Sequence, residues 1–302
     1  MVNIKGDPPL FTVLMPTHNR ADVLGAAIRS VLDQSETSFE LFVVGDGCTD
    51  GSADVVAGFD DPRVIWFDLP KAPGFGYANR NIALQRARGE LFAFAAHDDL
   101  YFPDHLKRMA EMFRRPQINW AYSRPLWVRD DGVVIPFFGN IRIGTERALF
   151  EQRNFIPASC VVFRRELHDR SGGWPEDVER TGDWVMWRRM LADHPHSAIG
   201  FCRQPTVLHF RANWRDPAKW APVPLPYLSA LADSSRIWPD SLKLRFTSDG
   251  GLPQHQMLNL LATEAQRICA RLRQGTENLQ DEIAWSAVVN QPFHRQIPMP
   301  EE

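Results

Sequence analysis

The first hundred residues alternate between short apolar runs and stretches with helical periodicity, and this alternation restricts the fold more than any other feature. Four runs have the continuous apolar character of strands buried on both faces: residues 11–15, 39–44, 64–67 and 91–96. Helical spacing of apolar residues marks the segments 23–32, 53–58, 77–88 and 103–113. Strands that alternate with helices form βαβ units, so we predict a Rossmann-like α/β fold with a mostly parallel sheet and flanking helices. Ligands bind such sheets at the carboxyl ends of the strands.

The pattern changes after residue 116. Apolar runs at 120–128 and 133–138 flank Asp130-Asp131-Gly132, a turn signal that predicts a hairpin. Further strands are predicted at 159–163, 197–202 and 206–210, with helices at 183–192 and 256–272. We therefore predict one domain over residues 1–215, with halves at about 1–115 and 116–215, and a mainly helical C-terminal extension over 216–302.

Composition excludes several classes of protein. The 302 residues carry 34 Lys and Arg against 37 Asp and Glu, a net charge of −3 that lacks the basic footprint of a nucleic-acid binder. The four cysteines have no metal-ligand spacing, which favours reduced thiols. No apolar run approaches the roughly 20 residues of a membrane span, and we see no secretory signal. We expect a cytoplasmic protein with no integral membrane segment.

Polar residues gather after three of the predicted strands. The segments are PTHNR at 16–20, GDGCTD at 45–50 and HDD at 97–99. Each segment alone is also explained by turns and helix caps. Asp98 and Asp99 are the most informative, because adjacent carboxylates repel each other unless a cation or a proton intervenes, and Mg²⁺ or Mn²⁺ prefers such oxygen ligands. The alternative is that one carboxylate caps the next helix and the other is solvated.

Five segments, in order, resemble the motifs of family 2 glycosyltransferases of the GT-A fold. They are PTHNR at 16–20, VVGDGCTD at 43–50, RN at 80–81 with ARGE at 87–90, AHDD at 96–99 before Pro103, and GDW at 182–184. The resemblance covers about residues 11–211. It implies a GT-A fold and an inverting transferase that takes a sugar from a nucleotide-diphosphate sugar, with Mn²⁺ or Mg²⁺ as cofactor.

The resemblance also implies roles for single residues. The nucleotide would be bound by Pro16, Thr17, Asn19, Arg20, Asp46, Arg80, His97 and Asp98. Asp46 matches the acid that accepts a hydrogen bond from the base, typically from uracil N3–H, so a UDP-sugar is the expected donor. Asp98 matches the metal-binding acid. His209 resembles a late metal or diphosphate ligand of some members, and the alternative for it is a satisfied core histidine.

Asp183 matches the general base that deprotonates the acceptor hydroxyl, which would belong to a saccharide, a glycolipid or a small molecule. Trp184 and Trp187 follow it and are candidates for the acceptor side, as an apolar wall or sugar platform, although core packing explains them equally well. Glu176 is a further candidate on the acceptor side. Competing acids for the base are Glu176, Asp177 and Glu179.

Two departures from the family pattern concern carboxylates. Gly45 and Ala96 stand where the family usually carries aspartate, so affinity for the donor or the metal is expected to differ. His97 either compensates as a ligand or points away. If the losses abolish catalysis, the chain is a degenerate member that only binds nucleotide or sugar. A sugar nucleotidyltransferase is a further alternative, but residues 16–20 hold none of the glycines that its first loop requires.

The C-terminal extension carries aromatic residues suited to an acceptor lid, namely Trp214, Trp220, Tyr227 and Trp238. Its last helix has an apolar stripe of Leu258, Leu261, Ala265, Ile268 and Leu272. Such a stripe packs on its own domain, forms a homodimer face, or lies on a membrane surface beside a lipid-linked acceptor.

Overall fold

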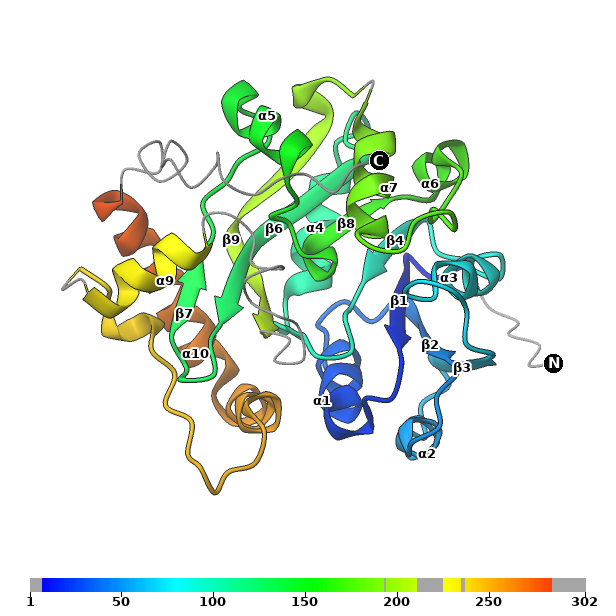
Figure 1. Ribbon diagram of the computed structural model, residues 1–302, viewed down its shortest axis with the longest axis horizontal. Helices are drawn as coiled ribbons and strands as arrows, with labels where there is room; N and C mark the ends of the chain where they lie inside the picture. The colour runs from blue at the N-terminus through cyan, green and yellow to red at the C-terminus, as the bar shows by residue number, and fades with distance from the viewer. Residues whose placement is uncertain (1–6, 193, 211–224, 235–236, 284–302) are drawn as a thin grey trace.

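The computed structural model describes residues 7–192, 194–210, 225–234 and 237–283. Its described strands form one nine-stranded sheet in the order β3-β2-β1-β4-β8-β6-β9-β5, with β7 paired to β6 (Figure 1). The first four strands are β1 (Phe11–Thr17), β2 (Phe39–Asp46), β3 (Val64–Leu69) and β4 (Leu91–Phe94). They pair in parallel with one another, as predicted. The α/β class with a mixed sheet and flanking helices is confirmed.

The second half of the sheet is mixed in direction. It consists of β5 (Leu100–Tyr101), β6 (Trp120–Val128), β7 (Val134–Pro136), β8 (Val161–Arg164) and β9 (Ile199–Phe210). β8 runs antiparallel to β4 and β6, whereas β6 and β9 are parallel. The predicted hairpin is present as β6 and β7. The two strands predicted at 197–202 and 206–210 are one strand, because β9 continues past Pro205 with a register shift opposite Arg124.

The helices cover both faces of the sheet. In the first half they are α1 (Ala21–Leu32), α2 (Ser52–Ala57), α3 (Tyr77–Leu84) and α4 (His105–Phe113). In the second half they are α5 (Gly144–Gln152), α6 (Arg165–Ser171), α7 (Gly182–Leu191), α9 (Leu225–Ser234) and α10 (Pro253–Glu282). The strand order reverses between β1 and β4, so right-handed crossovers place α1 and α2 on one face and α3 on the other. This reversal creates a crevice at the carboxyl ends of β1 and β4, where such folds bind ligands.

The long helix α10 belongs to the same hydrophobic core as the sheet. Leu272 and Leu279 are fully buried, and Leu261 and Ile268 nearly so. The helix packs against α1 and β9, and Arg273 forms an ion pair of 2.7 Å with Asp104 beside α4. Most of the stripe therefore packs against the sheet side of the molecule, with Leu258 and Ala265 half-buried. A boundary near residue 215 stays a prediction, as does homodimer formation through another part of the extension.

Trp214, just before the predicted extension, and Trp220 within it lie outside the described residues, and the side chain of Tyr227 is likewise not described. Trp238 is buried in the core and so does not form a lid. Among the described helices, none combines the length and the apolar character needed to cross a bilayer. The cytoplasmic location stays a prediction.

Candidate active site

Asn19 connects the loop after β1 to the loop after β2. Its backbone adopts a left-handed conformation with φ of 52°, which asparagine tolerates better than most residues. Its side-chain oxygen accepts hydrogen bonds from the backbone N–H groups of Thr49, at 2.8 Å, and Asp50, at 3.3 Å. Thr17, at the end of β1, is buried beside it. These contacts hold the predicted nucleotide-binding loops together at one edge of the sheet.

Asp46 ends β2 and is surrounded by donors. Its buried carboxylate pairs with the ammonium of Lys71 and accepts hydrogen bonds from Ala72 N and Asn79 Nδ2, both at 2.8 Å. The ring of His18 contacts the carbonyl oxygen of Asp46 through Nδ1, at 2.7 Å. Sequence reasoning missed Lys71 and Asn79. The carboxylate predicted to accept a hydrogen bond from the nucleotide base therefore also fixes the loop over residues 70–76.

Gly45 lacks a side chain for a packing reason. A Cβ at this position would overlap the indole ring of Trp66 on the neighbouring strand β3. An aspartate, as in the usual family pattern, does not fit unless Trp66 moves.

Asp98 and Asp99 have separate surroundings. Asp98 Oδ2 lies 3.5 Å from Arg20 Nη1, and the guanidinium of Arg20 also donates to Asp22 at 3.0 Å. Asp99 is buried and accepts hydrogen bonds from Ser159 Oγ and from Phe210 N. Neither carboxylate is left to solvent, and the residue that precedes α4 is Asp104, so the alternative of a cap and a solvated acid is wrong.

His97 turns toward Asp98 and does not point away. Its Nδ1 lies 3.1 Å from the carbonyl oxygen of Pro16, so the N–H is on Nδ1 and the lone pair is on Nε2. Burial lowers the pKa of the imidazole, which keeps the ring neutral. Nε2 lies 3.5 Å from Arg20 Nη1 and 4.0 Å from Asp98 Oδ2.

His209 lies on β9 with its Nδ1 held by Asp99 at 2.8 Å, and its ring packs edge-on against Trp127. A carboxylate behind one ring nitrogen is the usual support of a ligating histidine, because it fixes the tautomer and the ring orientation. Asp99 therefore orients His209, a role that the sequence did not reveal. The ligand role of His209 itself stays a prediction.

The donor atoms fit a divalent ion that arrives with a substrate diphosphate better than a resident one. Among the described residues, no three His, Cys, Asp or Glu side chains are grouped closely enough to hold an ion alone. Asp98 Oδ2 and His97 Nε2 supply two adjacent donors. Mg²⁺ is commonly bound by one or two carboxylates together with substrate phosphates and waters, which agrees with this small set.

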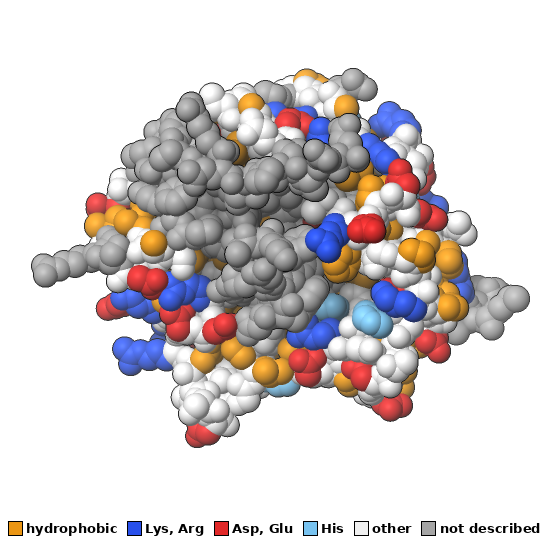
Figure 2. All heavy atoms as spheres, viewed as in Figure 1, with side chains coloured by type: hydrophobic (Ala, Val, Ile, Leu, Met, Phe, Trp, Pro, Cys, Tyr) orange, Lys and Arg blue, Asp and Glu red, His pale blue; other side chains and the backbone are white. Residues whose placement is uncertain are grey.

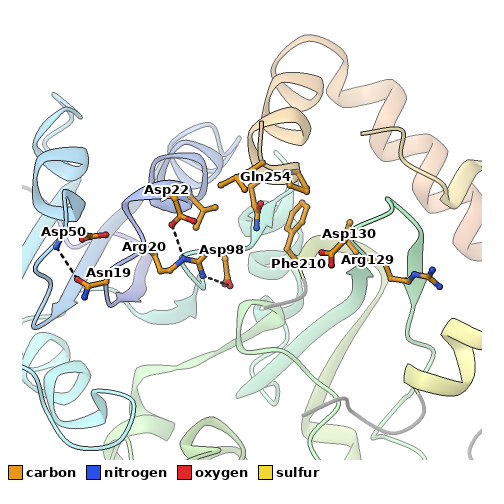
Figure 3. Close-up of a pocket in the computed structure, with 13 residues that line it drawn as sticks. Asn19, Arg20, Asp22, Asp50, Asp98, Arg129, Asp130, Phe210 and Gln254 are labelled. Atoms are coloured by element: carbon orange, nitrogen blue, oxygen red, sulfur yellow. Dashed lines mark hydrogen bonds and ion pairs between the residues drawn. The ribbon is translucent and has the colours of Figure 1, made fainter. Parts of the chain in front are cut away.

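A cavity of about 570 Å³ opens beside Asp98 (Figure 3). One wall is formed by Asn19, Arg20 and Asp22, at the start of α1. The opposite wall comes from the β6–β7 hairpin, Phe210 and the first turn of α10. Gln254 of α10 is buried and its side chain points into the cavity. The C-terminal helix therefore lines the site, which the sequence did not indicate. On the face of the molecule seen in Figure 2, the described acidic and basic side chains are interspersed.

Asp183 lies in the first turn of α7, where its Oδ2 accepts a hydrogen bond from Asn154 Nδ2 at 3.1 Å. Trp184 is partly buried, and its indole N–H donates to the carbonyl oxygen of Phe150. Trp187 is fully buried among aromatic rings, including that of Phe94. The prediction of a sugar platform is therefore wrong for Trp187, because no face of its ring reaches solvent.

Arg80 is a residue of α3, and Glu176 contacts the same helix through Asn81. Glu176 is exposed and accepts a hydrogen bond from Asn81 at 2.8 Å. The guanidinium of Arg80 lies 4.3 Å from the ring of Trp174 and donates to the carbonyl oxygen of Phe75. These contacts direct Arg80 toward the aromatic cluster, and its approach to the nucleotide stays a prediction.

Comparison with known proteins now adds to this geometry. A family model described as "Glycosyl transferase family 2" matches residues 12–172, more than half of the chain. The chain belongs to glycosyl transferase family 2. The predicted family is thus confirmed.

The names of two curated relatives of this family 2 chain describe succinoglycan biosynthesis and the transfer of glucose. Succinoglycan biosynthesis protein ExoO of Rhizobium meliloti is 38% identical over 196 residues, which cover 61% of this chain and 56% of ExoO. The Escherichia coli UDP-Glc:alpha-D-GlcNAc-diphosphoundecaprenol beta-1,3-glucosyltransferase WfgD is 28% identical over 193 residues, which cover 64% and 74% of the two chains. The match spans 65% and 52% of the first two curated relatives.

Solved structures share the fold at low sequence identity. Staphylococcus aureus TarS 1–349, in complex with UDP-GlcNAc, matches with a TM-score of 0.58 and 16% identity, over 90% of this chain and 92% of that chain. The mannosyltransferase PcManGT of Pyrobaculum calidifontis, in complex with GDP-Man and Mn²⁺, matches with a TM-score of 0.52 and 18% identity, over 94% and 90% of the two chains. Both support the family 2 fold.

Proposed function

We propose that this family 2 chain is an inverting glycosyltransferase that moves a sugar from a UDP-sugar to an acceptor hydroxyl. The observation that carries the proposal is that Asp46 and Asp98 follow β2 and β4 at the carboxyl ends of the parallel strands, while α3, which begins against Asp46, bonds the backbone of Gly182 directly before Asp183. The nucleotide would lie over residues 16–20 and against Asp46. The relatives whose names include a UDP-sugar support this choice of donor.

Arg20, His97 and Asp98 would hold the diphosphate end of the donor. The guanidinium supplies a fixed positive charge, whereas Nε2 of His97 and Oδ2 of Asp98 are the two atoms that would hold a divalent ion. A bound Mn²⁺ or Mg²⁺ acts as a Lewis acid that stabilises the negative charge of a departing diphosphate. The Mn²⁺ in the complex of PcManGT supports this assignment.

Asp183 would act as the general base. Its carboxylate accepts the proton of the acceptor hydroxyl while the oxygen attacks the anomeric carbon, and the bond to the diphosphate breaks with both electrons on the leaving oxygen. A single displacement of this kind inverts the anomeric centre. Asn154 holds one carboxylate oxygen and so would restrict the orientation of the base.

The first test is binding, because it needs no knowledge of the acceptor. Thermal shifts would be measured with UDP, GDP, TDP, ADP and CMP, each with and without Mn²⁺, on the wild type and on Asp98→Ala. We expect a shift with UDP that requires both Mn²⁺ and Asp98, since a ligand at 100 times its Kd stabilises by about 2.7 kcal/mol. A shift with another nucleotide alone would change the donor class.

No shift with any nucleotide would overturn the proposal. The absence of carboxylates at Gly45 and Ala96 would then favour a chain that binds a sugar or a partner without catalysis. The nucleotidyltransferase alternative has no support in the loop after β1, which holds no glycine and is fixed by Asn19. Release of pyrophosphate from a nucleoside triphosphate would revive it.

A further inference from the structure

Helix α3 begins directly against the acid that the proposed function assigns to the nucleotide base. Gly76 precedes the helix with φ of 72°, and a Cβ there would lie 2.6 Å from Cγ of Asp46. Only glycine permits this approach of the backbone to the carboxylate. One turn later, Asn79 donates to Asp46 Oδ1 at 2.8 Å. The position of Asp46 therefore sets the position of the first turn of α3.

The same helix holds the segment that leads to Asp183. The hydroxyl of Tyr77 accepts a hydrogen bond from the backbone N–H of Gly182 at 2.9 Å. Asn81 exchanges two hydrogen bonds with the backbone of Trp174, each of 2.9 Å. Tyr77 and Asn81 are four residues apart and so share one face of the helix. That face of α3 therefore holds the segment 174–182 at its first residue, Trp174, and at its last residue, Gly182.

The contact between Tyr77 and Gly182 leaves no spare volume. A Cβ at position 182 would lie 2.5 Å from Cζ of Tyr77. Tyr77 is itself buried and stacks on Trp174, with 5.7 Å between ring centroids and 7° between ring planes. The ring of Tyr77 is therefore held rigidly, and its hydroxyl fixes the backbone at the start of α7.

The backbone just before Asp183 needs such support. Thr181 has φ of 56°, a left-handed conformation that a β-branched residue rarely adopts. A conformation of this kind persists only where its surroundings determine it. The loop over residues 70–76 also touches this segment, since a Cβ on Gly74 would lie 3.1 Å from the carbonyl oxygen of Val178.

We propose that α3 is a bridge between the nucleotide and the general base, with Tyr77 as a positioning residue for Asp183. This inference rests on the proposed function. Asp46 fixes the loop over 70–76 and the first turn of α3, and a donor that contacts Asp46 restrains them further. Tyr77 holds Gly182, so that the carboxylate of Asp183 meets the acceptor hydroxyl.

Tyr77→Phe tests the bridge because it keeps the ring and removes the hydroxyl. The readout is the release of UDP from UDP-glucose in the presence of Mn²⁺, with water as the acceptor. We expect kcat to fall about 10- to 100-fold, since a displacement of about 1 Å costs that much, while the Kd for UDP stays unchanged. Ile82→Ala is the matched control, because Ile82 is on the same helix and 45% exposed.

A merely structural role for Tyr77 would weaken UDP binding and lower the melting temperature together with kcat. Unchanged kcat in Tyr77→Phe would overturn the proposal. Amide hydrogen exchange gives a second readout that needs no turnover: UDP should protect residues 177–184 in the wild type, and Tyr77→Phe should lose this protection while residues 70–77 keep theirs.

An experiment without nucleotide separates this inference from the proposed function. Asn79→Ala removes the hydrogen bond between Asp46 and the first turn of α3. We therefore expect faster amide exchange at residues 182–184 in the ligand-free protein, and no such change in Ile82→Ala. Unchanged exchange would overturn the bridge even if UDP binds. If the wild type binds no nucleotide, the proposed function fails. The exchange measured without ligand still decides whether α3 connects Asp46 to the backbone before Asp183.

Discussion

Gly45 and Ala96 occupy positions where the family pattern has aspartate, and the two sites have different replacements. At Gly45 the indole of Trp66 fills the volume that a side chain would need. At Ala96 the chain keeps its backbone contact to Ser159 Oγ, and the adjacent His97 presents Nε2 toward Asp98. At the residue scale, the volume of one missing carboxylate is filled by an apolar ring, whereas next to the other an imidazole lies beside Asp98.

Restoring the family residue at position 45 should destabilise the fold. Gly45→Asp overpacks the contact with Trp66, so we expect a loss of about 1–3 kcal/mol in the free energy of unfolding. In the double variant with Trp66→Ala, the loss should be smaller than the sum of the two single losses, as for residues that share one volume. Urea unfolding of the four proteins measures this, and strict additivity would contradict the packing explanation.

Asp183→Asn tests the general base at the same scale. The amide keeps the shape and accepts no proton, so sugar transfer or donor hydrolysis should fall on the order of 100- to 10,000-fold. The affinity for UDP should not change, because the base lies on the acceptor side. Rates measured by UDP release, with Asp177→Asn as the matched control, decide the assignment. Full activity in Asp183→Asn would transfer the role to another acid.

At the scale of elements, α4 and β9 are joined by a buried histidine. His105 of α4 is fully buried, and its Nδ1 lies 2.7 Å from Oγ1 of Thr206 on β9. Burial lowers the pKa of this imidazole from 6.5 to about 3. The short strand β5 (Leu100–Tyr101) pairs with β9 just before the same helix. The histidine therefore belongs to the packing that aligns β9, and with it His209, at the site.

The pKa of His105 predicts how stability changes in acid. Below pH 6.5 the unfolded chain binds a proton at this residue, whereas the folded protein does not until about pH 3. Stability therefore falls as the pH drops from 6.5 toward 3, by an amount on the order of a few kcal/mol from this group. Urea unfolding at several pH values should show that the free energy of unfolding falls less with decreasing pH in His105→Phe than in the wild type. An equal dependence on pH in the two proteins would contradict the prediction.

At the scale of the whole molecule, the sheet and α10 have one continuous core. Phe11 at the start of the sheet and Leu272 in the last described helix belong to the same cluster of buried side chains. The ion pair between Arg273 and Asp104 and the position of Gln254 in the cavity tie the same helix to α4 and to the site. The C-terminal helix therefore shares the hydrophobic core of the sheet and forms a wall of the cavity.

Leu272→Ala tests whether α10 and the sheet unfold together. Removal of this fully buried leucine side chain should lower the free energy of unfolding by about 2–5 kcal/mol. A single unfolding transition should remain, because the void left by the substitution lies in the core that α10 shares with the sheet. The control is Gln274→Ala, an exposed position on the same helix, which should change stability little. Calorimetry that resolved two transitions would show instead that the extension unfolds independently.

The sequence determined the elements whose signal is local. The apolar runs and helical spacing of residues 11–113 predicted β1 to β4 and α1 to α4 close to their observed positions. The two-residue strand β5 escaped prediction, because it exists only through its pairing with β9. The helices α5 and α6 also escaped prediction, since short helices carry few apolar repeats.

Sequence order and chemistry by themselves also placed the polar segments at one edge of the sheet and identified the family, because strand ends and motif spacing are linear properties of a chain. Only the tertiary structure decided which acid faces the site. Asp98 meets Arg20, whereas Asp99 turns inward to hold His209. It also decided that Trp187 is core and that α10 lines the cavity. These outcomes depend on side-chain direction and on contacts between residues far apart in the chain, and neither is contained in a local pattern.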